Sequence, residues 1–530
     1  MTEQKPFINE AVCEGCGDCG VKSNCVSIIP RETPFGRKRA IDQSSCNKDF
    51  SCVNGFCPSF VTVHGGTLRK PAGITSAPPE LPAPEMPDLE EPYGIVITGI
   101  GGTGVVTIGA LLGMAAHLEG KGASVLDQIG LAQKNGAVVS HVRIAKAPEA
   151  IHAVRIAAGG ARLLLGCDIV TAGGPETLAK VRTDYTRAVV NCHETMIADF
   201  TQNPDLAFPE ADLRAVITDS CGPEAAAFVD AGQLAAALMG DTIGTNLFMV
   251  GFAYQFGLLP LSADAIERAI EINGTAVEFN KQAFQWGRAA AHDLAAVEHA
   301  AGRDEHALEP ETAESVIARR ADELTAYHDE AYARRYTTLV ERVRAAEAAC
   351  LPRASALTDA VARAYFKLLA YKDEYEVARL YTDGRFAADL ARQFDGDFRL
   401  TFHLAPPLFG RRDPETGQLI KQEYGGSVMA AFRLLSRLKG LRGTPFDPFA
   451  HTAERRAERR LIGAYEDTVA ALLASLTPEN HAIACEIAAL PLSIRGFGHV
   501  KEASIAEAEA REAELMRAFH HPAPTADAAE

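Results

Sequence analysis

Short hydrophobic runs alternate with helix-like stretches between residue 94 and about residue 300. The runs GIVITG, ASVLD, LLLGCDIV and RAVVNC are separated by amphipathic segments and turn residues. Alternation of this kind is typical of strands that are joined by crossover helices in a largely parallel sheet. The pattern therefore predicts a doubly wound α/β domain over residues 93–300.

A helical period dominates the sequence that follows. From about residue 305 onward, Ala, Arg, Glu and Leu recur at helical spacing, as in ESVIARRADELTAYHDEAYARRYTTLVERVRAAEAA. The period is interrupted at 395–425, where strand-like alternation and turn residues replace it. We expect a mostly helical C-terminal domain over 301–515 and a flexible tail over 516–530. Within this region, 408–417 and 493–502 are candidate contact loops by composition.

A proline-rich segment, 71–92, precedes the α/β domain and is predicted to be a semi-extended linker. On its other side, residues 1–70 hold seven of the 12 cysteines. The 530 residues are thus expected to form a multidomain protein. The net charge of −17 argues against a nucleic-acid partner, and no hydrophobic run approaches the roughly 18 residues of a spanning helix. We expect a cytoplasmic protein with no membrane partner.

Three cysteines near the start of the chain share one tight loop. Cys13, Cys16 and Cys19 have C-x2-C-x2-C spacing with glycines between them. This spacing presents three thiolates to one iron–sulfur cluster, and the fourth ligand commonly is a distant Cys followed by Pro. Cys57, followed by Pro58, is that residue. The motif predicts a ferredoxin-like module with one complete [4Fe–4S] cluster that transfers electrons.

A second, incomplete motif lies in the same segment. It runs from Cys46 to Cys52, with Asp49 at the position of the middle cysteine, and Cys25 is the expected cross-ligand. The second cluster would be [4Fe–4S] with Asp49 as an oxygen ligand, or [3Fe–4S] with an open corner. Because carboxylate is a harder ligand than thiolate, an iron bound there should be more labile.

Two alternatives to this interpretation stay open. C-x2-C pairs also build zinc sites, although a run of three cysteines at this spacing fits tetrahedral zinc poorly. The second cluster could also be vestigial and empty. The other five cysteines are scattered, and we interpret them as small buried residues; they are Cys167, Cys192, Cys221, Cys350 and Cys485.

A glycine-rich turn opens the α/β domain. The sequence GIVITGIGGTG is followed by an amphipathic stretch, which predicts a strand, a turn and a helix. Such a turn directs backbone N–H groups and a helix N-terminus at an anion. Asp127 follows Gly104 by 23 residues. This is close to the roughly 20-residue spacing of a ribose-binding acid in dinucleotide sites. Taken alone, the motif favours NAD or FAD, and helix–strand packing without a ligand is the alternative.

The candidate binding residues include the turn and a polar stretch downstream of it. In that stretch Lys134 and Arg143 could meet phosphate, although a solvated surface charge explains each of them equally well. The candidates for cofactor binding are Gly99, Gly101, Gly102, Thr103, Gly104, Lys134 and Asn135.

These motifs together resemble the 2-oxoacid:ferredoxin oxidoreductases, and among them the indolepyruvate (arylpyruvate) branch. The similarity rests on the cysteine module at 13–58, on GIVITGIGGTGVVT, and on QKNGAVVSHVRI at 133–144. The C-terminal region is similar to the extra domain of long bacterial forms. The resemblance implies the iron–sulfur and gamma-domain subunit of such an enzyme, with no catalytic residue of its own.

The resemblance also implies a reaction. In this family a 2-oxoacid adds to thiamine diphosphate and is oxidatively decarboxylated, CoA takes the acyl group, and clusters pass electrons singly to ferredoxin. The GDG signature of a thiamine site is absent. The family therefore implies a partner subunit that holds thiamine diphosphate and Mg²⁺, in a heterotetramer of two plus two chains. It also makes the glycine turn a better match for CoA pyrophosphate than for NAD.

Two other functional hypotheses remain at this stage. The first is a flavin- or NAD(P)H-dependent ferredoxin reductase, in which the turn and Asp127 hold a dinucleotide. The second is a scaffold whose cluster is structural. The sequence has no second glycine-rich fingerprint and no obvious flavin-contacting motif, which lowers the reductase hypothesis.

Overall fold

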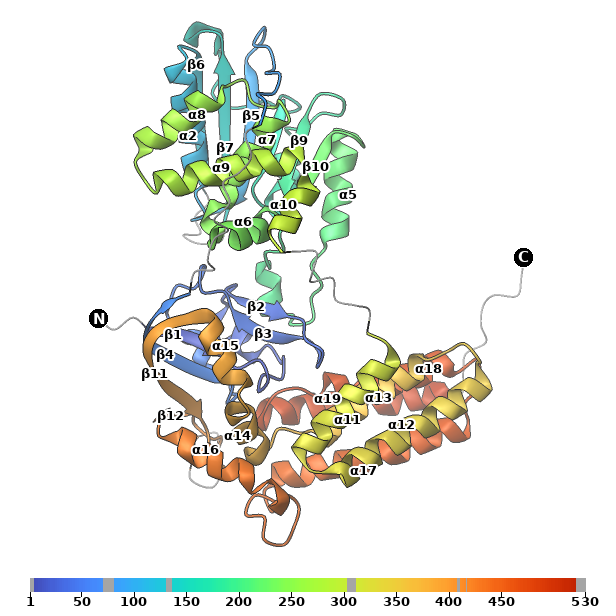
Figure 1. The fold of residues 1–530 in the computed structure, drawn as a ribbon. Helices are drawn as coiled ribbons and strands as arrows, with labels where there is room; N and C mark the ends of the chain where they lie inside the picture. The colour runs from blue at the N-terminus through green and yellow to red at the C-terminus, as the bar shows by residue number, and fades with distance from the viewer. Residues whose placement is uncertain are drawn as a thin grey trace, which may run out of the picture. The chain divides into compact units, whose positions relative to one another are not determined.

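The chain forms two compact units (Figure 1). The computed structural model describes residues 4–69, 81–129, 136–302, 311–407, 410–415 and 417–520. Unit 1 combines the N-terminal and C-terminal segments with a short central piece, and unit 2 contains the α/β region. The ranges are Met1–Arg69, Ile197–Leu206 and Leu308–Glu530 for unit 1, and Lys70–Met196 and Ala207–Ala307 for unit 2.

A six-stranded sheet forms the centre of unit 2, in the order β10-β9-β8-β5-β7-β6. The strands β5, β8, β9 and β10 are parallel, whereas β7 pairs antiparallel with both β5 and β6. The α/β prediction is confirmed, and the sheet departs from a parallel one at β7. The strands are β5 Tyr93–Ile100, β6 Gly122–Ile129, β7 Ala137–Ala145, β8 Leu163–Gly166, β9 Arg187–Asn191 and β10 Ala226–Val229.

Helices cover both faces of this sheet, so nearly every residue of β5 is buried. Ile95 and Ile97 face a core with α2, α6, α7, α8 and α9, while Val96 faces a second core with α3 and α5. The helices are α2 Val105–Leu118, η2 Pro148–Ala150, α3 Ile169–Ala172, α4 Pro175–Leu178, α5 Glu210–Cys221, α6 Ala231–Met239, η4 Thr242–Gly244, α7 Thr245–Gln255, α8 Ala263–Asn273, α9 Val277–His292 and α10 Leu294–Ala300.

Part of the proline-rich segment packs onto unit 2. Gln255 at the end of α7 donates a hydrogen bond to the Pro82 carbonyl (2.9 Å), and Arg288 of α9 donates to the Leu81 carbonyl (3.2 Å). Leu89 is buried in the same core as these helices. Residues 81–92 are therefore anchored on the α/β domain, and residues 70–80 lie outside the described residues.

Unit 1 is built around an antiparallel sheet in the order β1-β4-β11-β12. The strand β4 pairs with β1 on one side and with β11 on the other. The break in the helical pattern that we expect at 395–425 thus contains most of β11 and all of β12, which join β1 and β4 of the N-terminal segment in one sheet. Segments assigned from the sequence to separate domains share one sheet. The strands are β1 Gln4–Ile8, β4 Phe60–Leu68, β11 Phe394–Leu404 and β12 Gln422–Gly425.

One face of this sheet carries helices from the C-terminal region. Phe7 and Val61 of the sheet share a hydrophobic core with Tyr381, Phe386 and Phe432. The ring of Tyr381 meets Phe386 edge-on and stacks on Phe432. The helices here are α14 Glu374–Thr382, α15 Arg385–Gln393, α16 Val428–Arg437 and η6 Lys439–Leu441.

The cysteines occupy a small lobe beside β1 and β4. Cys13, Cys19 and Cys52 belong to a core that also contains Ile8 and Phe60. The lobe has one short hairpin, in which β2 pairs antiparallel with β3. Its elements are α1 Asp18–Ser23, β2 Ile28–Arg31, β3 Lys38–Ile41 and η1 Ser51–Asn54.

The remainder of unit 1 is a helical bundle, as the sequence predicts. Its core includes Tyr336, Tyr365 and Tyr465. The last helix reaches His520 and so extends into the segment expected to be a flexible tail; residues 521–530 lie outside the described residues. The helices are α11 Ala313–Tyr327, α12 Glu330–Cys350, α13 Ala356–Leu369, α17 Ala453–Ala474, α18 His481–Ala489, η7 Leu490–Ser493 and α19 Gly498–His520.

A short piece of the central sequence, Ile197–Leu206, belongs to unit 1. It includes η3 (Ala198–Thr201). Arg39 of β3 donates to the Pro204 carbonyl (2.7 Å) and lies 4.7 Å from the Phe200 ring centroid. Thr201 also donates to Asn24 (2.9 Å). This excursion of the chain braces the cysteine lobe, and no sequence signal predicted it.

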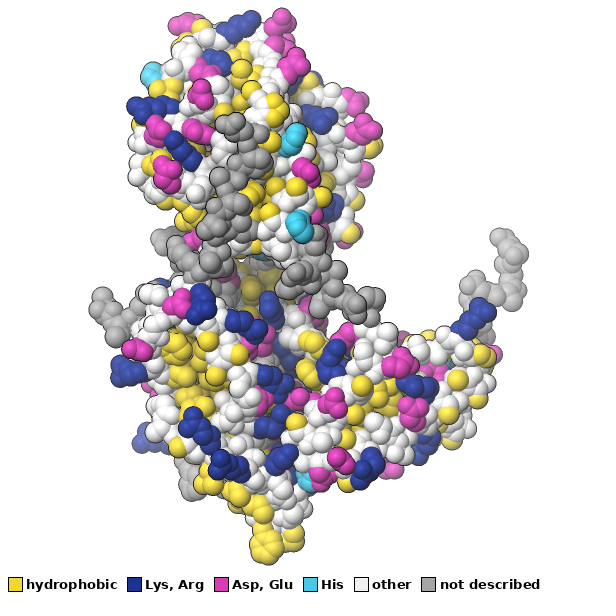
Figure 2. Space-filling model, in the orientation of Figure 1, with side chains coloured by type: hydrophobic (Ala, Val, Ile, Leu, Met, Phe, Trp, Pro, Cys, Tyr) yellow, Lys and Arg dark blue, Asp and Glu magenta, His cyan; other side chains and the backbone are white. Residues whose placement is uncertain are grey.

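Three large apolar side chains in α16 and just after it are exposed: Leu434, Leu438 and Phe446. Figure 2 shows a group of hydrophobic side chains at its lower edge. Of the helices that the structure describes, none combines the length and the apolar character needed to cross a bilayer.

Candidate functional site

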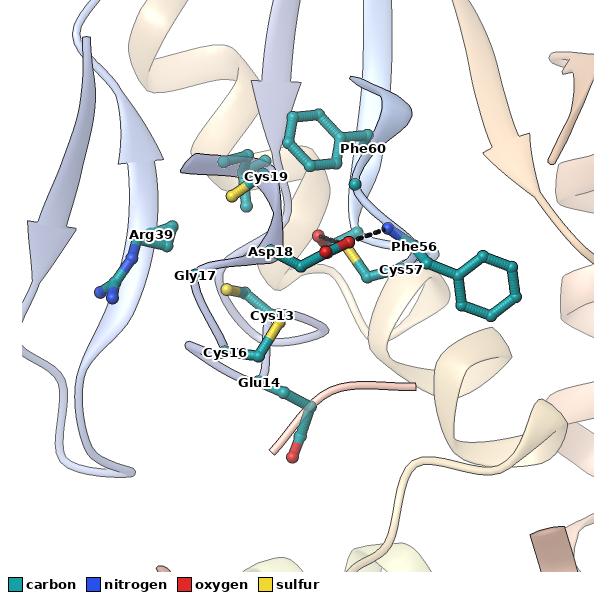
Figure 3. Close-up of a pocket in the computed structure, with 13 residues that line it drawn as sticks. Cys13, Glu14, Cys16, Gly17, Asp18, Cys19, Arg39, Phe56, Cys57 and Phe60 are labelled. Carbon is teal, nitrogen blue, oxygen red and sulfur yellow. Dashed lines mark hydrogen bonds between the residues drawn. The ribbon is translucent and has the colours of Figure 1, made fainter. Parts of the chain in front are cut away.

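Four cysteine side chains line one cavity in unit 1 (Figure 3). Cys13, Cys16 and Cys19 come from the loop between β1 and α1 and from the first turn of α1, and Cys57 comes from the segment just before β4. Cys13 and Cys19 are buried, and the other two are half-buried. The structure therefore brings together the four residues that the sequence assigns to the first cluster.

Glycines allow the loop to fold this tightly. Gly15 and Gly17 have φ angles of 71° and 80°, in the left-handed region. A Cβ at Gly15 would lie 2.3 Å from the carbonyl oxygen of Arg37, so this position admits no side chain. The backbone N–H of Gly15 donates a hydrogen bond to the Cys13 sulfur (3.3 Å). Hydrogen bonds to sulfur of this kind tune iron–sulfur clusters.

A single carboxylate fixes the distant fourth cysteine. Asp18, between Cys16 and Cys19, accepts a hydrogen bond of 2.6 Å from the backbone N–H of Phe56, which is the dashed line in Figure 3. The Cys57 sulfur also lies 2.9 Å from the Ser59 hydroxyl. These contacts hold the two cysteine segments in register across the cavity.

Burial in this cavity disfavours the deprotonated, anionic form of the cysteine side chains. Burial raises the pKa of Cys16 to about 12, and the neighbouring Cys57 adds to the rise. Burial and Cys57 likewise raise the pKa of Cys19 well above its usual value. Bound iron compensates such desolvation because a coordinated thiol is deprotonated outright. Converging soft donors in a closed cavity fit an iron–sulfur cluster.

The second set of cysteines also converges. Burial raises the pKa of Cys52 to about 12, and Cys25, Cys46 and Asp49 are near enough to add to the rise. Asp49 is exposed and accepts hydrogen bonds from the backbone N–H and the hydroxyl of Ser51 (3.0 and 2.8 Å). In the structure the Asp49 carboxylate therefore bonds within its own loop. That Asp49 binds iron stays a prediction.

Neither set forms a compact single-metal site. Among the residues that the structure describes, no three His, Cys, Asp or Glu side chains are placed to hold one metal ion. The five cysteines outside the module fit their predicted role in part, because Cys167, Cys192 and Cys221 are buried whereas Cys350 and Cys485 are half-buried.

The C-terminal region supplies a lysine to the first cysteine loop. The Lys372 ammonium donates to the carbonyls of Val12 (3.1 Å) and Cys13 (2.9 Å) and pairs with Glu14 at 2.7 Å. Burial opposes ionisation of Glu14, yet Lys372 and Lys38 together hold its pKa well below the usual range. This buried pair fixes the backbone on which two of the cysteines stand.

A second lysine binds the segment between Cys52 and Cys57. The Lys421 ammonium donates to the carbonyls of Val53 (2.8 Å) and Gly55 (2.7 Å). Burial lowers its pKa, and the nearby thiols of Cys57, Cys19 and Cys52 act in the opposite direction. A cation thus stands close to cysteines of both sets.

Sequence reasoning missed both lysines because no spacing links them to the cysteines. It did single out 493–502 as a contact loop by composition. In the structure Gly498 approaches Phe56, and the rings of His499 and Phe56 lie 4.8 Å apart. In the other loop so marked, 408–417, residues 408, 409 and 416 lie outside the described residues.

The glycine turn of unit 2 joins β5 to α2 as predicted. Gly99 is a packing residue, since a Cβ there would lie 2.7 Å from Val105. Gly101 donates its N–H to Gly136 O (2.7 Å), and Thr103 bonds back to Ile100 O through its hydroxyl (2.7 Å). Gly102 and Gly104 have positive φ, and at Gly102 a Cβ would meet no atom within 4 Å. The open part of the turn is therefore at Gly102.

Other residues assigned to a nucleotide site lie elsewhere or are not described. Lys134 and Asn135 lie outside the described residues. Asp127 is on β6, which β7 separates from β5, whereas a ribose-binding acid belongs on the strand next to the turn's strand. Arg143 on β7 donates to Ala153 O (3.1 Å). Within the residues that the structure describes, Asp127 and the glycine turn do not form the dinucleotide arrangement of the reductase hypothesis.

Comparisons with known proteins match two parts of the chain. Residues 94–290 match the family model described as pyruvate ferredoxin/flavodoxin oxidoreductase, and residues 313–514 match a family of unknown function (DUF6537). The indolepyruvate oxidoreductase subunits IorB of Thermococcus kodakarensis and Pyrococcus horikoshii are each 29% identical over 206 residues, which is 38% of this chain and 97% of theirs.

A solved structure also aligns with part of the chain. It is pyruvate oxidoreductase subunit PORC from Thermotoga maritima, at 20% identity over 37% of this chain and 96% of that one, with a TM-score of 0.28. The family model, and not this alignment, likens residues 94–290 to the pyruvate ferredoxin/flavodoxin oxidoreductases. The sequence relatives agree with the narrower resemblance, since part of this chain is similar to indolepyruvate oxidoreductase subunits.

Proposed function

We propose that this chain is the electron-transfer subunit of a thiamine-diphosphate-dependent 2-oxoacid:ferredoxin oxidoreductase that acts on arylpyruvates such as indolepyruvate. The observation that carries the proposal is the cavity lined by Cys13, Cys16, Cys19 and Cys57, in the same chain as the oxidoreductase domain. A [4Fe–4S] cluster there would have no open coordination position, which suits electron transfer and not substrate activation.

The proposed enzyme divides its chemistry between two chains. A partner subunit holds thiamine diphosphate and Mg²⁺ and decarboxylates the 2-oxoacid, two copies of each chain form the complex, CoA takes the acyl group, and ferredoxin receives the electrons. In this chain the second cluster would use Cys25, Cys46 and Cys52 with or without Asp49. The turn from Gly99 to Gly104 would contact CoA, together with Lys134 and Asn135.

The experiment is co-purification with the partner under anaerobic conditions, followed by metal analysis and an assay. We expect iron and acid-labile sulfide in place of zinc, the broad visible absorption of iron–sulfur clusters without flavin bands, and ferredoxin reduction that requires both CoA and an arylpyruvate. An aliphatic 2-oxoacid such as pyruvate serves as the matched substrate control. Zinc without sulfide, or resolved flavin bands, would contradict the proposal.

A further inference from the structure

A second cavity in unit 1 begins where the cysteine cavity ends. It has a volume of about 340 Å³, within the range of roughly 300–1,000 Å³ that is typical of small-molecule sites. Phe56 and Cys57 line both cavities. The backbone that carries one proposed cluster ligand is therefore also part of the wall of the second cavity.

The walls of this second cavity are mainly apolar and aromatic. They come from the segment before β4, from the end of β11 and the residues after it, and from α14 and α16, with the loops before α17 and α19 closing the rest. Such walls favour a flat, uncharged ring over a sugar or a phosphate. Representative residues are Pro58, Leu404, Pro406, Val428, Phe432 and Phe449.

A few polar groups interrupt the apolar lining. The Lys421 ammonium has three N–H donors, and two of them bond to the carbonyl oxygens of Val53 and Gly55. One donor is left. Arg455 is 5% exposed, and its Nη1 makes no hydrogen bond within the described part of the chain, although it lies 3.5 Å from Glu458. Three carboxylate residues, Asp373, Glu374 and Glu454, and a second lysine, Lys372, also line the cavity.

This combination favours a neutral acceptor of hydrogen bonds. Glu374 and Glu454 already pair with Arg455 at 3.3 and 3.7 Å, and Lys372 pairs with Glu14 at 2.7 Å, so these two cations have little charge left to attract a carboxylate or phosphate ligand. A flavin has more polar ring atoms than the one remaining donor of Lys421 can pair, and burying unpaired polar groups is costly. A quinone has an apolar ring and two carbonyl oxygens, and the remaining donor of Lys421 can meet one of them.

We propose that this cavity binds a small quinone, which takes electrons from the cluster at Cys57. The inference rests on the proposed function in one respect, because the neighbouring thiols must hold a [4Fe–4S] cluster. Each reduced cluster gives up one electron and returns to its oxidised state. Two such transfers, with two protons from solvent, convert the quinone into a hydroquinone, and no bond to the protein forms or breaks. The quinone would then be a second electron acceptor of this chain, besides ferredoxin.

Binding is tested first, with the oxidised, cluster-loaded full-length chain and 2-methyl-1,4-naphthoquinone under anaerobic calorimetry. We expect saturable binding at one site. Val428→Trp and Leu435→Trp fill the cavity and should each weaken binding about tenfold or more. Ala430→Trp adds the same ring at an exposed position of the same helix, α16, and should bind as the wild type does. Unchanged iron content in each variant shows that unit 1 is folded.

Electron transfer is tested next with the chain reduced by dithionite and desalted. The rate at which the quinone reoxidises the clusters should saturate with quinone concentration in the wild type and in Ala430→Trp. In the two cavity variants it should rise only linearly. Equal linear rates in every variant, or no saturable binding, would overturn this inference alone. A protein without iron and sulfide would overturn the proposed function, and this inference with it.

Discussion

The two cysteine sets lie in one small lobe but in different surroundings. The first set faces a cavity, and Lys372 and Tyr381 of the C-terminal region bond to the backbone at Cys13 and Pro58. The second set includes an exposed loop at 47–49. Exposure and hydrogen bonding set the potential and durability of such clusters. The comparison teaches that the cysteine spacing shows which set lacks a ligand, whereas only the surroundings show which set is protected from solvent.

The largest effect is expected at the fourth thiol of the first set. Cys57→Ser replaces a soft ligand by a hard one in a buried cavity, so the first cluster should be lost and the iron content should fall by about half if both sites are loaded. Ferredoxin reduction by the assembled enzyme should be abolished. Cys350→Ser, which alters a half-buried thiol outside both sets, should retain all iron. Full iron content in Cys57→Ser would contradict the assignment.

The next largest effect is expected on stability. Lys372→Met removes the cation in direct contact with buried Glu14 and leaves Lys38 nearby; breaking a buried pair costs about 3–5 kcal/mol of unfolding free energy, and Lys38 should keep the loss toward the lower end. Chemical denaturation of unit 1 measures the loss. Arg334→Met is the control, because that arginine and Glu330 are largely exposed and such pairs contribute about 0–1 kcal/mol. A loss as small as that of the control would mean that the first set does not depend on this support.

The same pair predicts a pH dependence. The pKa of Glu14 is lowered in the folded protein, so its stabilising contribution is present above its unfolded pKa and is lost as the pH falls toward the folded value. The difference in stability between wild type and Lys372→Met should therefore narrow as the medium is acidified below about pH 4.5. Denaturation curves at several acidic pH values check this, and a constant difference would contradict it.

A smaller effect is expected on reduction potential. Lys421 stands near cysteines of both sets, and a nearby positive charge favours the reduced, more negative cluster. Removing it in Lys421→Met should lower the potential of the first cluster by about 50 mV, which corresponds to roughly 1 kcal/mol of screened Coulomb energy. A redox titration followed by EPR measures the shift. Lys439→Met, whose ammonium bonds to the Ala326 carbonyl, should leave the potential unchanged.

The smallest change concerns one iron atom. Asp49→Cys gives the second set a fourth thiolate, and a [3Fe–4S] cluster should become [4Fe–4S] with a gain of one iron per chain. The EPR signal of the oxidised three-iron cluster should disappear. Asp49→Asn keeps the shape of the side chain but removes the carboxylate, so it should leave a [3Fe–4S] cluster unchanged and should cost a [4Fe–4S] cluster with Asp49 as a ligand one iron. Unchanged iron and spectra in Asp49→Cys would show that the wild-type second site is already complete or empty.

Much of the site was accessible from the sequence, because cluster ligands follow fixed local spacings. The spacing from Cys13 to Cys19 and the Cys57–Pro58 pair predicted which side chains meet. The α/β domain was accessible for a similar reason, since buried strands are short apolar runs. Lys372 and Lys421 were not predictable, because their partners are backbone carbonyls more than 300 positions away along the chain. The antiparallel direction of β7 was also missed, because a short run of hydrophobic residues does not indicate the direction of its strand.

The pairing of β4 with β11 has a consequence for biosynthesis. The cysteines are translated first, whereas Phe394–Leu404 leaves the ribosome only after the whole of unit 2. Until then one edge of β4 has no strand beside it, and Lys372 and Lys421 do not yet exist. Iron and sulfide delivered before residue 421 has been translated would meet a half-built lobe, so we expect the first cluster to mature only after β11 and both lysines have been made. Expressing residues 1–70 alone would reproduce that immature state.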